Sequence, residues 1–197
     1  MSGKWLARAA LTSLVAVCAP ACASGPEPLR LHDASGALRE PFADAACRRA
    51  LVLLFVDPEC PISNAYAPEV KRLAAEFGPR GVELELVYSA PGLDPQAVRR
   101  HVADFGYELP ALLDSDQRLA ARAGATVTPE AVVFLPDGEL VYRGRIDDRF
   151  VDFGRQRPQP TQRELRDALE ALLAGRAPPV PRTESVGCPI PRARASD

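Results

Sequence analysis

An uninterrupted apolar run at residues 51–56 constrains this chain more than any other stretch of its 197 residues. The run is too short to span a membrane, and its length is typical of a strand buried on both faces. An amphipathic helix follows, because apolar residues recur at three- and four-residue steps up to Phe77, after which Gly78 supplies a stop. The sequence therefore predicts a buried strand, a turn at residues 57–60 and a helix packed against the strand.

Cys60 lies where this strand ends and the helix begins, and Pro61 suits a first helical position. Unpaired N–H groups and the positive end of a helix dipole favour the thiolate form of cysteine. The thiolate is the form that attacks disulfides and peroxides and binds metals. We therefore interpret Cys60 as reactive, and the alternative is that it is a small buried core residue.

The strand, the sequence Cys-Pro-Ile-Ser at residues 60–63 and Pro68 within the helix resemble the active-site element of the thioredoxin fold. They are most similar to exported thioredoxin-like proteins and to redoxins of the alkyl hydroperoxide reductase and thiol-specific antioxidant superfamily. This resemblance implies an α/β fold, in which a central mixed sheet is flanked by helices. It also implies an N-terminal hairpin and an internal insertion. One residue departs from the pattern, because Ser63 replaces the second cysteine of a CxxC pair.

The two ends of the chain differ in composition from its middle. Residues 1–23 resemble an export signal, with Lys4, Arg8, an apolar stretch and a small-x-small cleavage site at residues 21–23. We expect a domain at residues 24–175, followed by a proline-rich tail at residues 176–197. The protein is then exported or periplasmic, and it is membrane-bound only if Cys22 is lipidated.

Charge and cysteine usage limit the possible partners. Lys and Arg total 24 against 26 Asp and Glu, so no charge excess favours nucleic acid. We expect a monomer with no cofactor and no metal. Cleavage of the signal leaves Cys47, Cys60 and Cys188 in a compartment that permits disulfides. Three thiols cannot all pair within one chain, and Cys47, just before the buried strand, is expected to pack.

Patterns along the rest of the chain predict an ordered series of elements. A hairpin is expected at residues 29–42, and alternation predicts a strand at residues 82–88. A helix at residues 95–105, a short strand at residues 109–113 and a helix at residues 115–124 resemble the family's insertion. A hairpin follows at residues 131–145. The final helix is expected to start from a capping box of Thr161 and Glu164 and to end at Gly175.

Thr128 and Pro129 directly precede the first strand of that second hairpin. In thioredoxin folds this is the place of a cis proline that faces the active cysteine. The resemblance therefore implies that both residues stand beside Cys60, with backbone groups free to pair with an extended substrate. The alternative is a trans proline at the start of an edge strand.

Arg143, Arg145, Asp147, Asp148 and Arg149 cluster just after this hairpin. A solvated surface is the expected environment for such a cluster. One arginine, with Arg145 as the candidate, could lie near Cys60 and favour its thiolate.

Cys188 lies in the proline-rich tail, thirteen residues after Gly175. An extended segment of that length spans about 40 Å, whereas a domain of this size has a radius of gyration of about 14 Å. Cys188 can therefore reach Cys60. The alternative is a free tail thiol or an intermolecular tether.

These features lead to one main functional hypothesis and two alternatives. The main hypothesis is thiol-disulfide exchange, in which Cys60 attacks a protein disulfide, Cys188 resolves the intermediate and an external thiol reductant resets the pair. One alternative is a thiol peroxidase, although Asp57 stands where peroxiredoxins carry a Thr or Ser. The other is a scaffold with a structural Cys60–Cys188 disulfide or a bound metal.

Overall fold

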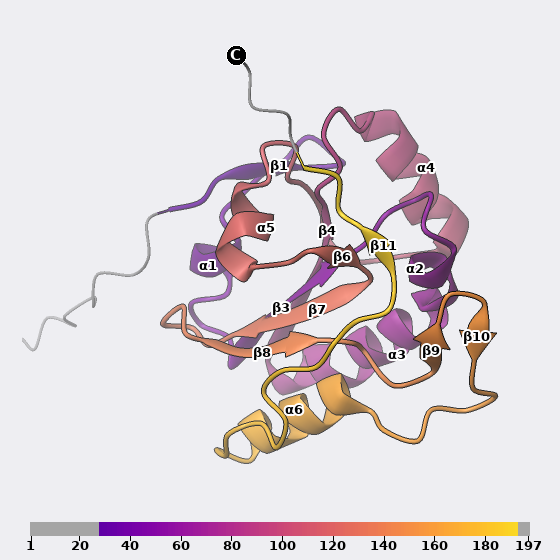
Figure 1. The fold of residues 1–197 in the computed structure, drawn as a ribbon. Helices are drawn as coiled ribbons and strands as arrows, with labels where there is room; N and C mark the ends of the chain where they lie inside the picture. The colour runs from indigo at the N-terminus through magenta and orange to yellow at the C-terminus, as the bar shows by residue number, and fades with distance from the viewer. Residues whose placement is uncertain (1–27, 193–197) are drawn as a thin grey trace, which may run out of the picture.

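The computed structural model describes residues 28–192, and a seven-stranded mixed sheet forms its centre (Figure 1). The expected export signal, including Cys22, lies outside the described residues. In chain order the elements are β1 (Leu31–Asp33), β2 (Leu38–Arg39), α1 (Pro41–Asp44), β3 (Ala50–Phe55), α2 (Pro61–Ala65), α3 (Ala67–Phe77), a 3-10 turn (Gly78–Arg80), β4 (Val82–Tyr88), α4 (Pro95–Phe105), β5 (Ala111–Leu113), α5 (Arg118–Ala123), β6 (Val127–Thr128), β7 (Glu130–Phe134), β8 (Leu140–Gly144), β9 (Phe150–Asp152), β10 (Arg155–Gln156), α6 (Glu164–Leu173) and β11 (Cys188–Pro189).

The main sheet has the strand order β2-β1-β5-β4-β3-β7-β8. Strands β3, β4 and β5 are parallel, whereas β7 and β8 continue the sheet in antiparallel fashion on one side and β1 and β2 do so on the other. Every residue of β3 is buried, as the apolar run predicts. This strand is central because both of its edges are paired and both of its faces are covered.

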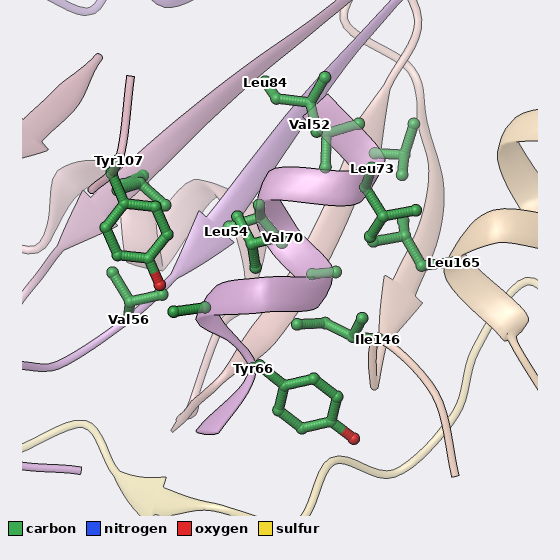
Figure 2. Close-up of a cluster of buried hydrophobic side chains, with 14 of the residues drawn as sticks. Val52, Leu54, Val56, Tyr66, Val70, Leu73, Leu84, Tyr107, Ile146 and Leu165 are labelled. Atoms are coloured by element: carbon green, nitrogen blue, oxygen red, sulfur yellow. The ribbon is translucent and has the colours of Figure 1, made fainter. Parts of the chain in front are cut away.

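The two faces of β3 contribute to two separate hydrophobic clusters. Val52, Leu54 and Val56 point to one cluster, whereas Leu51, Leu53 and Phe55 point to the other. Figure 2 shows the first cluster, in which Val70 and Leu73 of α3 and Leu165 of α6 pack on the sheet. On the opposite face, α5 and the segment around α1 cover the second cluster. The sheet is therefore flanked by helices on both sides, as expected.

The helix expected after Cys60 is split into α2 and α3 at Tyr66. Pro68 lies in the first turn of α3, where a missing N–H leaves no helical hydrogen bond unmade. The expected apolar face is confirmed, because Ile62, Tyr66 and Val70 are buried. Pro68 thus accounts for the division into two helices, and the apolar residues of both helices still face the core.

Other predicted elements are confirmed with small corrections. The strand at β4 and the helix at α4 match the prediction, and α4 is capped by Asp94 and ended by Gly106. The first hairpin is shorter than expected, because residues 41–44 form α1 instead of a strand. The capping box at α6 is wrong: the Thr161 hydroxyl donates to the carboxylate of Asp148, and α6 has no side-chain cap.

After α6 the chain returns across the fold (Figure 1). Residues 181–191, here called the docked tail, lie along β8 and β6 and end beside α5. Residues 28–175 are called the body. Within residues 28–192, no helix is long and apolar enough to cross a membrane.

Candidate functional site

Cys60 is fixed by the turn that connects β3 to α2. It is the N-cap residue of α2, and its sulfur accepts a hydrogen bond from the Ser63 N–H at 3.4 Å. The Cys60 N–H donates to the Asp57 carbonyl, and the Cys60 carbonyl accepts from the Asn64 N–H. Only 1% of the residue is exposed. The predicted placement of Cys60 at the start of a helix is confirmed.

Thr128 and Pro129 lie directly beside this sulfur. The peptide bond between them is cis, and the Cys60 thiol donates to the Thr128 carbonyl oxygen at 3.1 Å. Thr128 is buried, and β7 begins at the next residue after the proline. Strand β7 pairs with β3, so the main sheet itself brings the Thr128–Pro129 segment to Cys60.

The docked tail covers the same place. Strand β11 pairs antiparallel with β6, so that Cys188 is opposite Thr128 and Pro189 is opposite Val127. The Ile190 N–H donates to the Thr126 carbonyl at 2.9 Å, and the Thr128 hydroxyl donates to the Cys188 carbonyl at 3.4 Å. The tail therefore occupies the edge of β6 as an added strand.

Gly187 allows the tail to approach this closely. A Cβ atom at that position would lie 2.7 Å from the Thr128 carbonyl carbon and closer still to its oxygen. Real Cβ atoms do not approach so near, so any larger residue would push the tail away from β6. The glycine immediately before Cys188 is thus required for the observed docking.

Cys188 packs against the buried cluster that contains Cys60, and both residues are free thiols. Burial raises the pKa of the Cys188 thiol, and a hydrogen bond to Cys60, the charge of Cys60 and the charge of Asp57 raise it further. The Cys188 thiol therefore keeps its proton more firmly than an ordinary cysteine. Two free thiols packed in one site can take part in thiol–disulfide exchange.

A second set of contacts holds the docked tail along β8. The Arg143 N–H donates to the Pro181 carbonyl, and the Thr183 N–H donates to the Arg143 carbonyl. The Thr183 hydroxyl accepts from the Arg145 N–H at 3.0 Å. A Cβ atom on Gly144 would lie 2.7 Å from the Thr183 carbonyl oxygen, so a second glycine permits this close approach.

No protein-family model and no curated protein matches the sequence. Among solved structures, an uncharacterized conserved protein from Geobacillus kaustophilus matches with a TM-score of 0.76 at 28% identity, over 86% of this chain and 91% of its own. A hypothetical protein from Sinorhizobium meliloti 1021 matches with a TM-score of 0.74 at 27% identity, over 83% and 90%. A secreted Mycobacterium tuberculosis disulfide oxidoreductase homologous to E. coli DsbE gives 0.51 at 23% identity, over 75% and 96%. This chain has the thioredoxin fold.

Next to the turn between β3 and α2 of this thioredoxin fold lies a largely buried chain of polar side chains, which was not expected from the sequence. Asn64 donates through Nδ2 to the Pro58 carbonyl and accepts through Oδ1 from His101 Nε2, each at 2.8 Å. His101 Nδ1 then accepts from the Tyr88 hydroxyl at 2.8 Å. Burial lowers the pKa of His101, which keeps the ring neutral as this pattern requires. The chain ties α4 of the insertion to the residues that flank Cys60.

Several expectations about this thioredoxin fold are wrong. Arg145 directs its guanidinium to Glu164 and Gln162 and not to Cys60. Its neighbours Asp147 and Asp148 are buried and not solvated. Cys47 is exposed and does not pack in the core. The errors for Arg145, Asp147 and Asp148 share a cause, because their side chains pair with Glu164, Tyr66 and Thr161, which local sequence does not place beside them.

Metal ligands do not cluster in the part of the chain that the structure describes. No group of three or more His, Cys, Asp or Glu residues in that part is arranged to hold an ion. His101 uses both ring nitrogens in the hydrogen bonds given above. Asp57, at the position of the peroxiredoxin hydroxyl, accepts the Glu59 N–H through its own carboxylate. The chemistry that the thioredoxin-fold site supports directly is that of its two thiols.

Proposed function

We propose that this protein is an exported thiol-disulfide oxidoreductase in which Cys60 is the nucleophile and Cys188 is its intramolecular partner. The observation that carries the proposal is the docking of β11 on β6, which sets Cys188 opposite Thr128, the residue whose carbonyl accepts the Cys60 thiol. Cys188 thereby serves as the second cysteine, which Ser63 replaces in the CxxC position. The secreted M. tuberculosis disulfide oxidoreductase has the same fold, and we extend its compartment and reaction type to this chain as part of the proposal.

The proposed reaction has two steps. The Cys60 thiolate attacks one sulfur of a protein disulfide, forms a mixed disulfide and releases the other substrate sulfur as a thiolate. The Cys188 thiol then gives up its proton and attacks the Cys60 sulfur, which releases the second substrate thiolate and leaves a Cys60–Cys188 disulfide. An external thiol reductant returns the pair to its starting state. Because Cys60 is enclosed, the first step requires the docked tail to lift from β6.

Serine variants of the three described cysteines test this function. We expect Cys60→Ser to abolish the reduction of a protein disulfide such as insulin, because the attacking sulfur is lost. Cys188→Ser should accumulate a mixed disulfide on Cys60. Cys47→Ser is the control and should behave as wild type, because Cys47 is exposed and lies outside the site. An oxidised wild-type protein without a Cys60–Cys188 crosslink would contradict the proposal.

The reduction potential separates a redox-active pair from a structural disulfide. Structural disulfides in exported proteins lie below about -300 mV, whereas exchangeable ones are more oxidising. We expect the pair to titrate above that value against a glutathione or dithiothreitol buffer. A lower potential would assign the crosslink to the scaffold alternative.

A further inference from the structure

The two sulfurs of the proposed redox pair differ in access. Cys60 is 1% exposed, since it is enclosed by Thr128 and by the docked tail. Cys188 is partly exposed, and it lies on the two-residue strand β11, which within residues 28–192 pairs with β6 alone. A solvent-borne reagent therefore meets Cys188 first while the tail remains docked.

The two sulfurs also differ as leaving groups. The Cys60 sulfur accepts the Ser63 N–H, a contact that stabilises negative charge as it develops there. A sulfur whose developing negative charge is stabilised in this way leaves more readily from a disulfide. Expulsion of Cys60 is therefore the easier of the two possible cleavages.

We infer that, in the oxidised protein, an incoming thiolate attacks the sulfur of Cys188 and expels Cys60. The inference rests on the proposed function, because it requires a Cys60–Cys188 disulfide. The thiolate RS⁻ forms a new bond to the Cys188 sulfur, the Cys60–Cys188 bond breaks, and its electron pair leaves on Cys60. A second thiolate then attacks the R sulfur, releases Cys188 as a thiolate that takes up a proton, and departs as RSSR. Two thiols are oxidised and one protein disulfide is reduced.

The order of attack follows from the docking of the tail and so depends on Gly187. Moving the tail away from β6 uncovers Cys60 and removes the difference in access. A Cβ atom at Gly187 collides with Thr128, whereas a Cβ atom at Gly78 meets nothing within 4 Å. Gly187→Ala and Gly78→Ala thus add the same methyl group with opposite consequences for the tail.

The point of attack can be read from three tryptic peptides. Cleavage at Lys and Arg places Cys47, Cys60 and Cys188 in the separate peptides 40–48, 50–71 and 183–192. Oxidised wild-type protein is mixed with excess glutathione, quenched in acid at early times, alkylated with N-ethylmaleimide and digested. We expect glutathione on peptide 183–192 and N-ethylmaleimide on peptide 50–71, with at least about tenfold more glutathione on Cys188 than on Cys60.

Each outcome of this experiment decides a different point. Glutathione found mainly on Cys60 in the wild type overturns the inference and leaves the proposed function intact. Gly187→Ala should shift the adduct toward Cys60 while Gly78→Ala keeps the wild-type ratio, and an unchanged ratio in Gly187→Ala also counts against the inference. Oxidised protein without a crosslink between peptides 50–71 and 183–192 overturns the proposed function, and the inference with it.

Discussion

The chain holds Cys60 and Cys188 in different ways. Cys60 is held by short-range structure, since β3, one turn and α2 lie within a few residues of it and β3 is buried throughout. Cys188 is held by backbone pairing across the fold, with its tail docked on β6 and β8. The first sulfur therefore belongs to the cooperative core, whereas we expect the segment that carries the second to lift while the core stays folded. Cys60 is then the rigid partner and Cys188 the mobile one.

A disulfide between Cys60 and Cys188 would remove this difference in mobility. Of the changes considered, it should have the largest effect on the free energy of unfolding. Joining Cys60 to Cys188 closes a loop of well over a hundred residues. By loop-closure entropy, oxidation should raise the free energy of unfolding by about 5 kcal/mol. Urea unfolding of the oxidised and reduced proteins measures the gain.

Cys47→Ser is the control for oxidation, and it should show the same gain as wild type. Cys188→Ser should show none, because it lacks the partner thiol. Equal stability of oxidised and reduced wild type would mean that the crosslink does not hold the tail to the body.

Glu85 in β4 is a buried carboxylic acid that tests the stability of the body without involving the tail. It is fully buried, with one carboxylate oxygen paired to Arg39 at 3.2 Å, and burial raises its pKa from 4.5 to about 7. Between these values the folded state binds the proton more tightly than the unfolded chain, so the free energy of unfolding falls as the pH rises through this window. The expected loss is about 3 kcal/mol.

Glu85→Gln should flatten this pH dependence, as measured by urea unfolding of the reduced protein from pH 4.5 to pH 7.5. Glu139→Gln, between β7 and β8, is the control and should keep the wild-type slope, because its charge is not one of those that act on Glu85. A slope that survives in Glu85→Gln would assign the titration to another group. The tail amides should exchange as in wild type, because Glu85 contacts Arg39 in the body and not the tail.

Tyr66, at the junction of α2 and α3, tests the part of the body nearest to Cys60. Its hydroxyl donates to the Asp147 carboxylate at 2.6 Å. Tyr66→Phe should lower the free energy of unfolding by about 1 to 2 kcal/mol, because the buried carboxylate loses a donor. Urea unfolding measures the loss, and Tyr107→Phe is the matched control, because the Tyr107 hydroxyl has no hydrogen-bond partner among the described residues. Equal losses in the two variants would contradict the assigned role of this hydrogen bond.

The same contrast explains what the sequence could predict. Local patterns fixed the course of β3, β4 and α4, because apolar periodicity, Asp94 and Gly106 act within a few residues. The position of Cys60 at a strand-to-helix junction followed from the same reasoning. The resemblance of the Thr128–Pro129 segment to the thioredoxin pattern placed it beside Cys60, as the structure has it.

The remaining features depend on contacts between distant segments. The length of the tail showed only that Cys188 could reach Cys60, whereas its register on β6 depends on Gly187 fitting against Thr128. Arg145 was assigned to the wrong partner, because Glu164 becomes its neighbour only when α6 packs on the sheet. His101 carried no sequence signal either, since Asn64 and Tyr88 reach it from separate elements.

Substitution of Thr183 should have the smallest effect on stability, and it tests how firmly the docked tail is held. Its hydroxyl accepts the Arg145 N–H and contacts the Tyr142 hydroxyl, so Thr183→Val keeps the shape but removes both interactions. Thr183→Val should lower the free energy of tail opening by about 1 kcal/mol and leave the free energy of global unfolding unchanged. In the reduced protein, hydrogen exchange of the Ile190 amide should then accelerate roughly fivefold.

Ser185→Ala is the matched control for the tail, because the Ser185 hydroxyl is buried without a hydrogen-bond partner among residues 28–192. Its removal should leave the exchange of Ile190 unchanged. Amides of β3 should exchange at the wild-type rate in both variants, since their protection depends on global unfolding. If Thr183→Val accelerates β3 and Ile190 equally, the tail unfolds only with the body and the two cysteines are held alike. If β3 is unaffected and Ile190 accelerates, the tail lifts on its own, as attack by Cys60 on an external disulfide requires.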